Sequence, residues 1–153
     1  MSLFKYKKKD KIIVIDFGSQ VTKLIARRVR EVGVYSEILN LNELNKLHEY
    51  SYIKGIILSG GPSTVINKSF PLISKKIFSQ KIPILGICFG HQLVAKIFNG
   101  KVKSKKQKRE FGRAVLISKK SSILTKNFFT KGKANVWMSH QDAVIKLPKN
   151  FIK

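Results

Sequence analysis

Cysteine, acidic residues and long apolar runs are all scarce in this sequence. The 153 residues contain one cysteine, Cys88, so an intrachain disulfide is excluded and a reducing compartment is favoured. The longest apolar run, 82–94, is interrupted by glycine and is too short to cross a bilayer. The N-terminal segment has basic residues but lacks the apolar core of a secretory signal. We therefore expect one cytoplasmic domain over residues 1–153, with no membrane attachment.

Basic residues far outnumber acidic ones. Lysine and arginine total 31 against 8 aspartate and glutamate residues, which gives a formal charge of +23. This charge would attract phosphate backbones, so a basic nucleic-acid-binding protein is one open interpretation. The 26 lysines and 5 arginines are spread along the chain, without an arginine-rich or aromatic-interleaved stripe. We attribute the charge to an A/T-rich coding bias, which also raises isoleucine and asparagine, and expect no specific nucleic-acid binding.

Apolar, strand-like runs alternate with amphipathic segments over the first hundred residues. The run "KIIVIDFG" is β-branched and ends in a turn glycine, whereas the segment after it has helical spacing. This alternation predicts an α/β fold with a mostly parallel sheet flanked by helices on both faces. The expected strands are 11–18, 34–39, 55–62 and 82–87, and the expected helical segments are 19–32, 69–80 and 89–98. The apolar face expected for 19–32 consists of Val21, Leu24, Ile25, Val29 and Val32.

The pattern changes after residue 101. Short strand candidates separated by turn signals predict a small antiparallel region in the C-terminal third, at 112–118, 135–140 and 142–147. In the parallel part, ligands bind beyond the carboxyl ends of the strands. Because the turn glycines at positions 18, 60 and 90 all follow expected strands, we expect the functional site at that edge of the sheet.

Cys88 lies between two glycines, where an expected strand meets an expected helix. The segment "GICFG" has the spacing of a nucleophile elbow with cysteine in place of serine. Such a tight turn leaves no room for side chains two positions before and after the nucleophile, so Gly86 and Gly90 suit it. A helix N-terminus also favours a thiolate over a thiol. The alternative is a buried structural cysteine; we interpret Cys88 as a nucleophile.

Acyl transfer also needs hydrogen-bond donors for an oxyanion. The backbone amide of Phe89 is one candidate, and "LSGGPST" at 58–64 offers amides at the end of a neighbouring strand. A Gly-Gly-Pro turn alone indicates only a turn. Together with the elbow, it predicts the second half of an oxyanion hole.

Several motifs together resemble one family of enzymes. The segments "IDFGSQ", "ARRVRE", "ILSGGPST", "GICFGHQ", "REFG" and "VWMSHQD" are similar to those of class I glutamine amidotransferase domains, in the branch found in GMP synthetases. The resemblance covers nearly the whole chain and implies a flavodoxin-like fold. It further implies a glutaminase that hydrolyses glutamine to glutamate and ammonia through a cysteine thioester. The implied partner is an ATP-pyrophosphatase domain or subunit, which uses the ammonia to convert xanthosine monophosphate to GMP.

The resemblance also implies roles for individual residues. Cys88 is the nucleophile, and Gly60 and Phe89 donate backbone amides to the oxyanion. No metal site and no cofactor are implied for this chain, since ATP and magnesium belong to the synthetase partner. The implied substrate contacts are Gly61, Gln92, Ser139 and His140, the last two through their backbone at the amino-acid end of glutamine.

One family segment is not found in these residues. Family members complete the site with a His-Pro-Glu run, in which histidine is the base and glutamate orients it; this sequence contains no such run. His48 falls in a polar loop, His91 follows the elbow where related histidines are not the base, and His140 falls near the substrate clamp. Without a base, a factor on the order of 10² to 10⁴ in rate is lost. We therefore expect a C-terminally incomplete amidotransferase domain with impaired activity and no ATP-pyrophosphatase domain. A catalytically silent domain that binds glutamine or a synthetase stays an alternative.

Overall fold

The structure is a computed structural model that describes residues 10–66, 70–104, 110–118, 120, 122–140 and 142–152. The chain divides into two compact units, with the boundary between Val94 and Ala95. The first unit contains a four-stranded sheet, and the second contains two antiparallel strand pairs. In the described residues, no helix is long and apolar enough to span a membrane.

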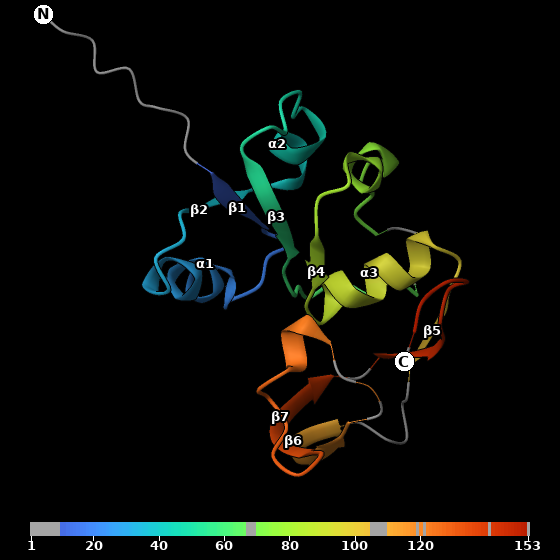
Figure 1. Ribbon diagram of the computed structural model, residues 1–153. Helices are drawn as coiled ribbons and strands as arrows, with labels where there is room; N and C mark the ends of the chain where they lie inside the picture. Colours follow the sequence, from blue (N-terminus) through green and yellow to red (C-terminus); the bar gives the residue numbers. More distant parts are fainter. Residues whose placement is uncertain are drawn as a thin grey trace, which may run out of the picture. The chain divides into compact units, whose positions relative to one another are not determined.

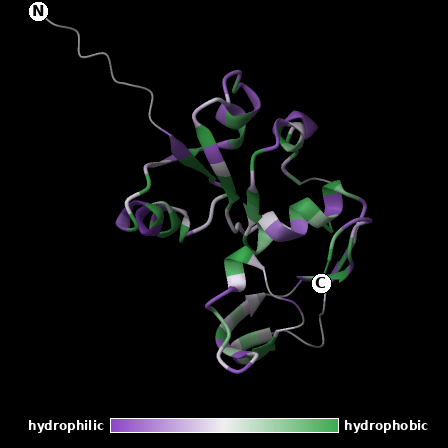
Figure 2. Ribbon diagram, in the orientation of Figure 1, coloured by the Kyte–Doolittle hydropathy of each residue, from purple (hydrophilic) through white to green (hydrophobic). Residues whose placement is uncertain are grey.

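A parallel sheet with the strand order β2-β1-β3-β4 forms the centre of the first unit (Figure 1). Its consecutive isoleucine, valine and leucine residues favour buried parallel strands, since β-branched side chains pack well on such a sheet. The second half of β3 is coloured as hydrophobic in Figure 2. The strands are β1 Lys11–Ile15, β2 Ser36–Leu39, β3 Ile53–Leu58 and β4 Ile84–Gly86. The α/β fold with flanking helices is confirmed.

The register of the sheet brings the carboxyl ends of three strands together. Ile15 at the end of β1 pairs with Leu58 at the end of β3, and Leu58 pairs with Gly86 at the end of β4. Ile15 and Leu58 are fully buried. The loops that follow β1, β3 and β4 therefore begin side by side at one edge of the sheet. The helices of this unit are α1 Thr22–Glu31, α2 Leu41–Asn45, the 3-10 helix η1 Lys75–Gln80 and α3 Phe89–Ile97, which continues past the unit boundary.

The buried face of α1 differs from the expected apolar face. Thr22 and Ala26 are buried, whereas Val21, Leu24 and Val32 are exposed. The expectation that these three valine and leucine residues face inward is therefore wrong. Thr22 is buried because its hydroxyl finds polar partners inside the protein. Ala26 is small, which allows the helix backbone to come close to β2.

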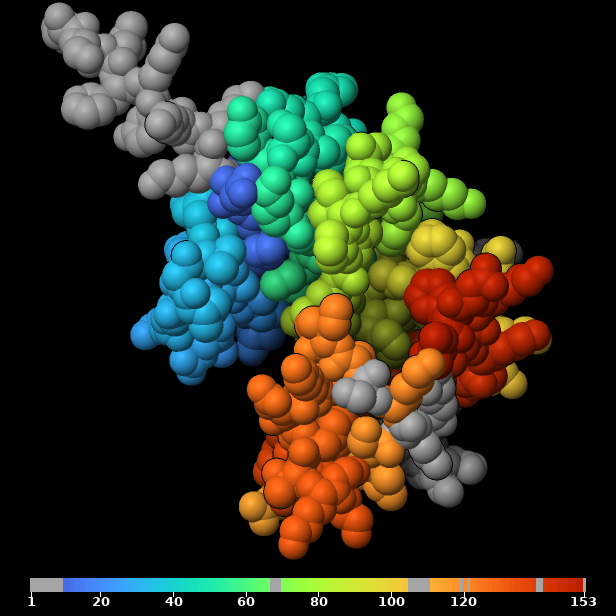
Figure 3. Space-filling view, in the orientation of Figure 1, coloured from blue at the N-terminus to red at the C-terminus, as the bar shows by residue number. Residues whose placement is uncertain are grey.

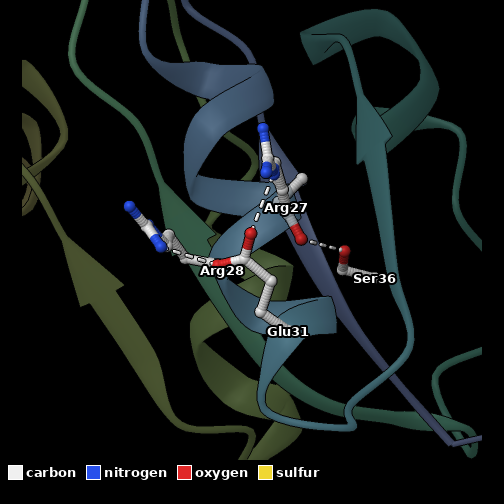
Figure 4. A network of polar contacts seen from close by, with 5 residues as sticks. Arg27, Arg28, Glu31 and Ser36 are labelled. Atoms are coloured by element: carbon white, nitrogen blue, oxygen red, sulfur yellow. Dashed lines mark hydrogen bonds and ion pairs between the residues drawn. The ribbon is translucent and has the colours of Figure 1, made fainter.

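Hydrogen bonds join α1 to β2, and ion pairs lie on the exposed side of the helix. Ser36 on β2 donates its hydroxyl to the carbonyl of Ala26 at 2.9 Å and accepts from Nε of Arg30 at 3.0 Å. On the exposed side, Glu31 accepts from Nε of Arg27 at 2.8 Å and from Nη1 of Arg28 at 2.7 Å (Figure 4). The arginines of "ARRVRE" therefore bind groups on their own helix and the adjacent strand.

Two short helical elements differ from the expected pattern. α2 was not expected; it begins with a capping box in which Asn40 and Glu43 each accept from the other's backbone amide. The expected segment 69–80 is helical only over η1, as a 3-10 helix, with Ile77 as its buried residue. Residue 69 itself lies outside the described residues.

The second unit is built from antiparallel pairs, as expected. β5 Lys101–Ser104, which was not expected, pairs with β8 Asp142–Lys146, and β6 Glu110–Ile117 pairs with β7 Lys133–His140. A short 3-10 helix, η2 Ile123–Thr125, lies between β6 and β7 in the sequence. Side chains of the orange segment from η2 through β7 are visible at the surface in Figure 3, and Trp137 is 75% exposed.

Candidate functional site

The backbone of Cys88 has the conformation of a nucleophile elbow. Cys88 lies between the end of β4 and the start of α3, and its φ angle is +50°. A positive φ is uncommon for a residue with a Cβ atom and is found where the surrounding structure holds a strained turn. The thiol is exposed, so the alternative of a buried structural cysteine is wrong.

Both glycines that flank Cys88 are required by close backbone contacts. A Cβ atom on Gly86 would lie 2.7 Å from the Cα and N atoms of His91, and one on Gly90 would lie 2.2 Å from the carbonyl oxygen of Leu58. No real Cβ atom occurs at such distances from backbone atoms, so any side chain here would displace the chain. The steric reason given for the two glycines is confirmed.

Two main-chain hydrogen bonds tie the elbow to the end of β3. The amide of Ile87 donates to the carbonyl of Leu58 at 2.9 Å, and the amide of Gly90 donates to the carbonyl of Ser59 at 3.0 Å. These bonds bring the Gly-Gly-Pro loop against the nucleophile. A Cβ atom on Gly60 would lie 3.5 Å from the Cβ atom of Cys88, so the two expected halves of the site do meet.

The loop after β1 is the third part of this region. Phe17 on that loop and Phe89 at the start of α3 pack edge to face, with ring centroids 5.2 Å apart, and both are buried. A Cβ atom on Gly61 would lie 2.5 Å from the carbonyl oxygen of Phe17. Loops after three different strands therefore hold one another in place around Cys88.

A buried polar network connects the first and third strands beneath these loops. Thr22 Oγ1 donates to Asp16 Oδ1 at 2.8 Å and lies 3.3 Å from Ser59 Oγ. The Ser59 hydroxyl also contacts the amide of Phe17 at 3.3 Å and the carbonyl of Gly60 at 2.9 Å. We did not expect Asp16, Phe17, Thr22 and Ser59 at the site. The available signal was the motif "IDFGSQ", which contains the first two, and "ILSGGPST", which contains Ser59.

The remaining predicted residues lie in different places. Gln92 is buried in the first turn of α3, where its backbone amide donates to the carbonyl of Cys88 at 3.1 Å. His91 and His48 are exposed. Ser139 and His140 lie on β7 in the second unit. The substrate contacts assigned to Gln92, Gly61, Ser139 and His140 stay predictions.

Two motifs that are distant in the sequence are neighbours in the second unit. Glu110 pairs with His140 and Phe111 pairs with Ser139, so residues 110–112 of "REFG" lie opposite residues 138–140 of "WMSH" in one antiparallel ladder. Gly112 in this ladder has φ +101°, which explains its glycine through backbone conformation. Within the described residues, no three His, Cys, Asp or Glu side chains gather as metal ligands.

Comparison with known proteins decides the family. The sequence pattern of the family described as "Glutamine amidotransferase class-I" matches residues 13–153. The chain belongs to the class I glutamine amidotransferases. A glutamine-hydrolyzing GMP synthase from Agrobacterium fabrum is 47% identical over 143 residues, and one from Helicobacter pylori is 48% identical over 141 residues. These alignments cover 93% and 92% of this amidotransferase chain but only 27% of each relative.

Solved structures support the same family. A Thermoplasma acidophilum protein described as part of a GMP synthase has a TM-score of 0.77 and 32% identity, covering 92% of this chain and 69% of that one. A glutamine amidotransferase from Thermotoga maritima shares the fold, with a TM-score of 0.66 at 22% identity, covering 91% of this chain and 63% of that one. The expected family and fold are confirmed, and the chain spans about a quarter of the length of the GMP synthases it matches.

Proposed function

We propose that this chain is the glutaminase part of a GMP synthase. In this reaction the sulfur of Cys88 attacks the carboxamide carbon of glutamine, and an S–C bond forms. The C–N bond then breaks, and the nitrogen takes up a proton and leaves as ammonia. Water attacks the resulting thioester, which releases glutamate and restores the thiol. The backbone amides of Phe89 and of the loop at Gly60 and Gly61 are the donors for the oxyanion.

The observation that carries this proposal is the strained, exposed Cys88 beside the Gly-Gly-Pro loop. Cys88 has a φ angle of +50°, and close backbone contacts surround Gly86 and Gly90. A cysteine that only filled space would not require this strained turn. Family membership supplies the chemistry that such a thiol performs. Similarity to GMP synthases supplies the proposed substrate and pathway.

Ammonia from this reaction needs a second active site to receive it. We propose an ATP-pyrophosphatase domain or subunit that binds ATP and magnesium and aminates xanthosine monophosphate in the cytoplasm. The matched GMP synthases are much longer than this chain, which supports a partner of this kind. Addition of such a synthetase should convert glutamine-dependent ammonia release into GMP formation.

The test is glutamate release by two forms of the protein. One form is the 153-residue chain, and the other is extended with the downstream His-Pro-Glu segment of a complete relative. We expect weak hydrolysis by the first form and an increase of roughly 10² to 10⁴ in rate for the second, because a general base contributes about this factor. Cys88→Ala in the extended form should abolish the release.

The possible outcomes separate the alternatives. Hydrolysis that survives Cys88→Ala would show that the proposal is wrong. Glutamine binding without hydrolysis in the extended form would favour the silent regulatory domain. Rapid, Cys88-dependent hydrolysis by the 153-residue chain would retain the function but show that His140 or another residue is the base.

A further inference from the structure

The two peptide groups that follow β3 are each held through their carbonyl. The carbonyl of Ser59 accepts from the amide of Gly90 at 3.0 Å, and the carbonyl of Gly60 accepts from the hydroxyl of Ser59 at 2.9 Å. Both peptides are trans, so each N–H points opposite to the carbonyl of its own peptide group. The first bond therefore fixes the direction of the Gly60 amide, and the second fixes that of the Gly61 amide.

The Gly60 and Gly61 amides are fixed in direction but are not used as donors among the described residues. In the part of the chain that the structure describes, neither amide donates to a protein acceptor. Gly60 is buried, while Gly61 is partly exposed. An oriented, unused amide beside a nucleophile is the arrangement that stabilises a developing oxyanion. The Gly61 amide is oriented by a side-chain hydrogen bond, which the hydroxyl of Ser59 donates to the Gly60 carbonyl.

The Ser59 hydroxyl itself is held in one direction. It is fully buried, and it accepts a hydrogen bond from the amide of Phe17 at 3.3 Å. Its single proton is then available for the carbonyl of Gly60. Thr22 also has a single hydroxyl proton, which binds Asp16 at 2.8 Å, a shorter contact than the 3.3 Å to Ser59. The Gly60 carbonyl, at 2.9 Å from Ser59 Oγ, is closer than Thr22 Oγ1 at 3.3 Å, so the carbonyl is the favoured acceptor for the Ser59 proton.

We propose that Ser59 is a positioning residue that sets the direction of the Gly61 amide toward the oxyanion formed at Cys88. This inference rests on the proposed glutaminase function. Ser59 has no direct contact with the reacting atoms in this role and acts through one peptide group. Loss of its hydroxyl would leave the Gly60 carbonyl without its partner and free the Gly60–Gly61 peptide to rotate. The bond from Gly90 to the Ser59 carbonyl would remain, so the elbow itself would keep its geometry.

Two reactions of Cys88 distinguish positioning from a general structural role. The aldehyde analogue of glutamine, glutamate γ-semialdehyde, is in equilibrium with its cyclic imine, and the open aldehyde adds reversibly to the thiol. An S–C bond forms, the carbonyl electron pair moves to oxygen, and the oxygen takes the thiol proton, so the adduct places an oxygen at the oxyanion position. Iodoacetamide alkylates the same sulfur by displacing iodide, a reaction in which no oxyanion develops. When the alkylation rate of Cys88 by iodoacetamide is measured at increasing aldehyde concentration, one experiment gives both the affinity for the aldehyde and the alkylation rate of the free thiol.

Ser59→Ala should raise the aldehyde concentration needed for half-protection by about tenfold, which is less than the factor of about 10² to 10³ for complete loss of an oxyanion donor, because the Gly61 amide is freed to rotate and is not removed. The alkylation rate without aldehyde should stay within about twofold of that of the unsubstituted chain. Thr22→Ser retains the hydroxyl and should behave like the unsubstituted chain. Thr22→Val removes the hydroxyl and should raise the half-protection concentration by less than Ser59→Ala does.

Three results would overturn the inference, and they differ in whether the proposed glutaminase function is retained. Unchanged aldehyde protection in Ser59→Ala would reject the positioning role but keep the proposed function. Equal loss of aldehyde protection and of alkylation rate would show that Ser59 only maintains the fold of the elbow. A lack of protection in the unsubstituted chain would reject the glutaminase function together with the inference.

Discussion

Glycine occurs both at the elbow around Cys88 and in the β6–β7 hairpin, but in different surroundings. At the elbow, Cβ atoms on Gly86 and Gly90 would come within 2.7 Å and 2.2 Å of backbone atoms. In the hairpin, Gly112 and Gly132 have positive φ angles of 101° and 76°, with nothing within 4 Å of an added Cβ atom. Lack of space selects glycine at the elbow, whereas backbone conformation selects it in the hairpin.

The same contrast extends to side-chain burial. The fully buried large residues, such as Phe89, Ile13 and Leu58, all lie in the first unit. In the second unit, Trp137, Ile117 and Ile123 are 75%, 65% and 98% exposed. Among the described residues, the large side chains that are fully buried therefore belong to the unit that carries Cys88. A site whose geometry must be held to within a few tenths of an ångström requires close packing around it.

The largest expected effect is from Gly90→Ala. The added methyl group would overlap the Leu58 carbonyl oxygen, so β3 and α3 must separate, at a cost of more than about 3 kcal/mol. Hydrogen exchange of the β3 and β4 amides in the variant should become much faster. A variant with unchanged exchange would contradict the crowding described at the elbow.

Gly60→Ala should affect ligand binding at Cys88 while the fold is retained. The added Cβ atom fits at ordinary contact distance, 3.5 Å from both the Cβ atom of Cys88 and Oγ of Ser19. It occupies space beside the thiol, so half-protection by the aldehyde should need more than about tenfold higher concentration. Amide exchange in β3 should be unchanged. Normal aldehyde binding would indicate that substrate does not approach from the Gly60 side.

Gly132→Ala tests the other reason for glycine. No atom blocks the methyl group, so the penalty comes from the positive φ angle alone, at about 1 to 2 kcal/mol. Exchange of the β6 and β7 amides should accelerate, while exchange in β3 stays unchanged. A penalty as large as that of Gly90→Ala would remove the distinction between the two regions.

The smallest effect is expected at the outer surface of α1. Glu31→Ala removes the ion pairs to Arg27 and Arg28, whose side chains are 75% and 73% exposed. Solvent screens such pairs, so the free energy of unfolding should fall by less than about 0.5 kcal/mol. Thermal unfolding measured at low and high salt should show little difference between the two proteins. A loss above about 1 kcal/mol would mean that this surface contributes to the packing of the first unit.

Local sequence patterns predicted much of the first unit. The β-branched run of β1 and the spacing of Gly86, Cys88 and Gly90 are short-range signals, because strand burial and a tight turn impose them directly on neighbouring residues. The capping box of α2 is a local signal of the same kind, because Asn40 is followed three residues later by Glu43.

Long-range contacts account for what the sequence did not predict. Thr22 is on the buried face of α1 because Asp16 and Ser59 supply partners, and Ser59 is 37 residues away. Periodicity counts a threonine as polar and places it outside. The role of Ser59 likewise depends on the amide of Phe17, 42 residues earlier. No pattern within one segment could place these groups together.

The hydrogen bond from Gly90 to Ser59 also has a consequence for the newly synthesised chain. Ribosomes produce β1 and β3 before the elbow, so the acceptors at Leu58 and Ser59 exist before their donors at Ile87 and Gly90 emerge. The strained turn at Cys88 closes only against that earlier strand. Until then the thiol belongs to a flexible chain and has the chemistry of a free cysteine. The nucleophile therefore acquires its geometry only when the end of β3 is in place to accept these two hydrogen bonds.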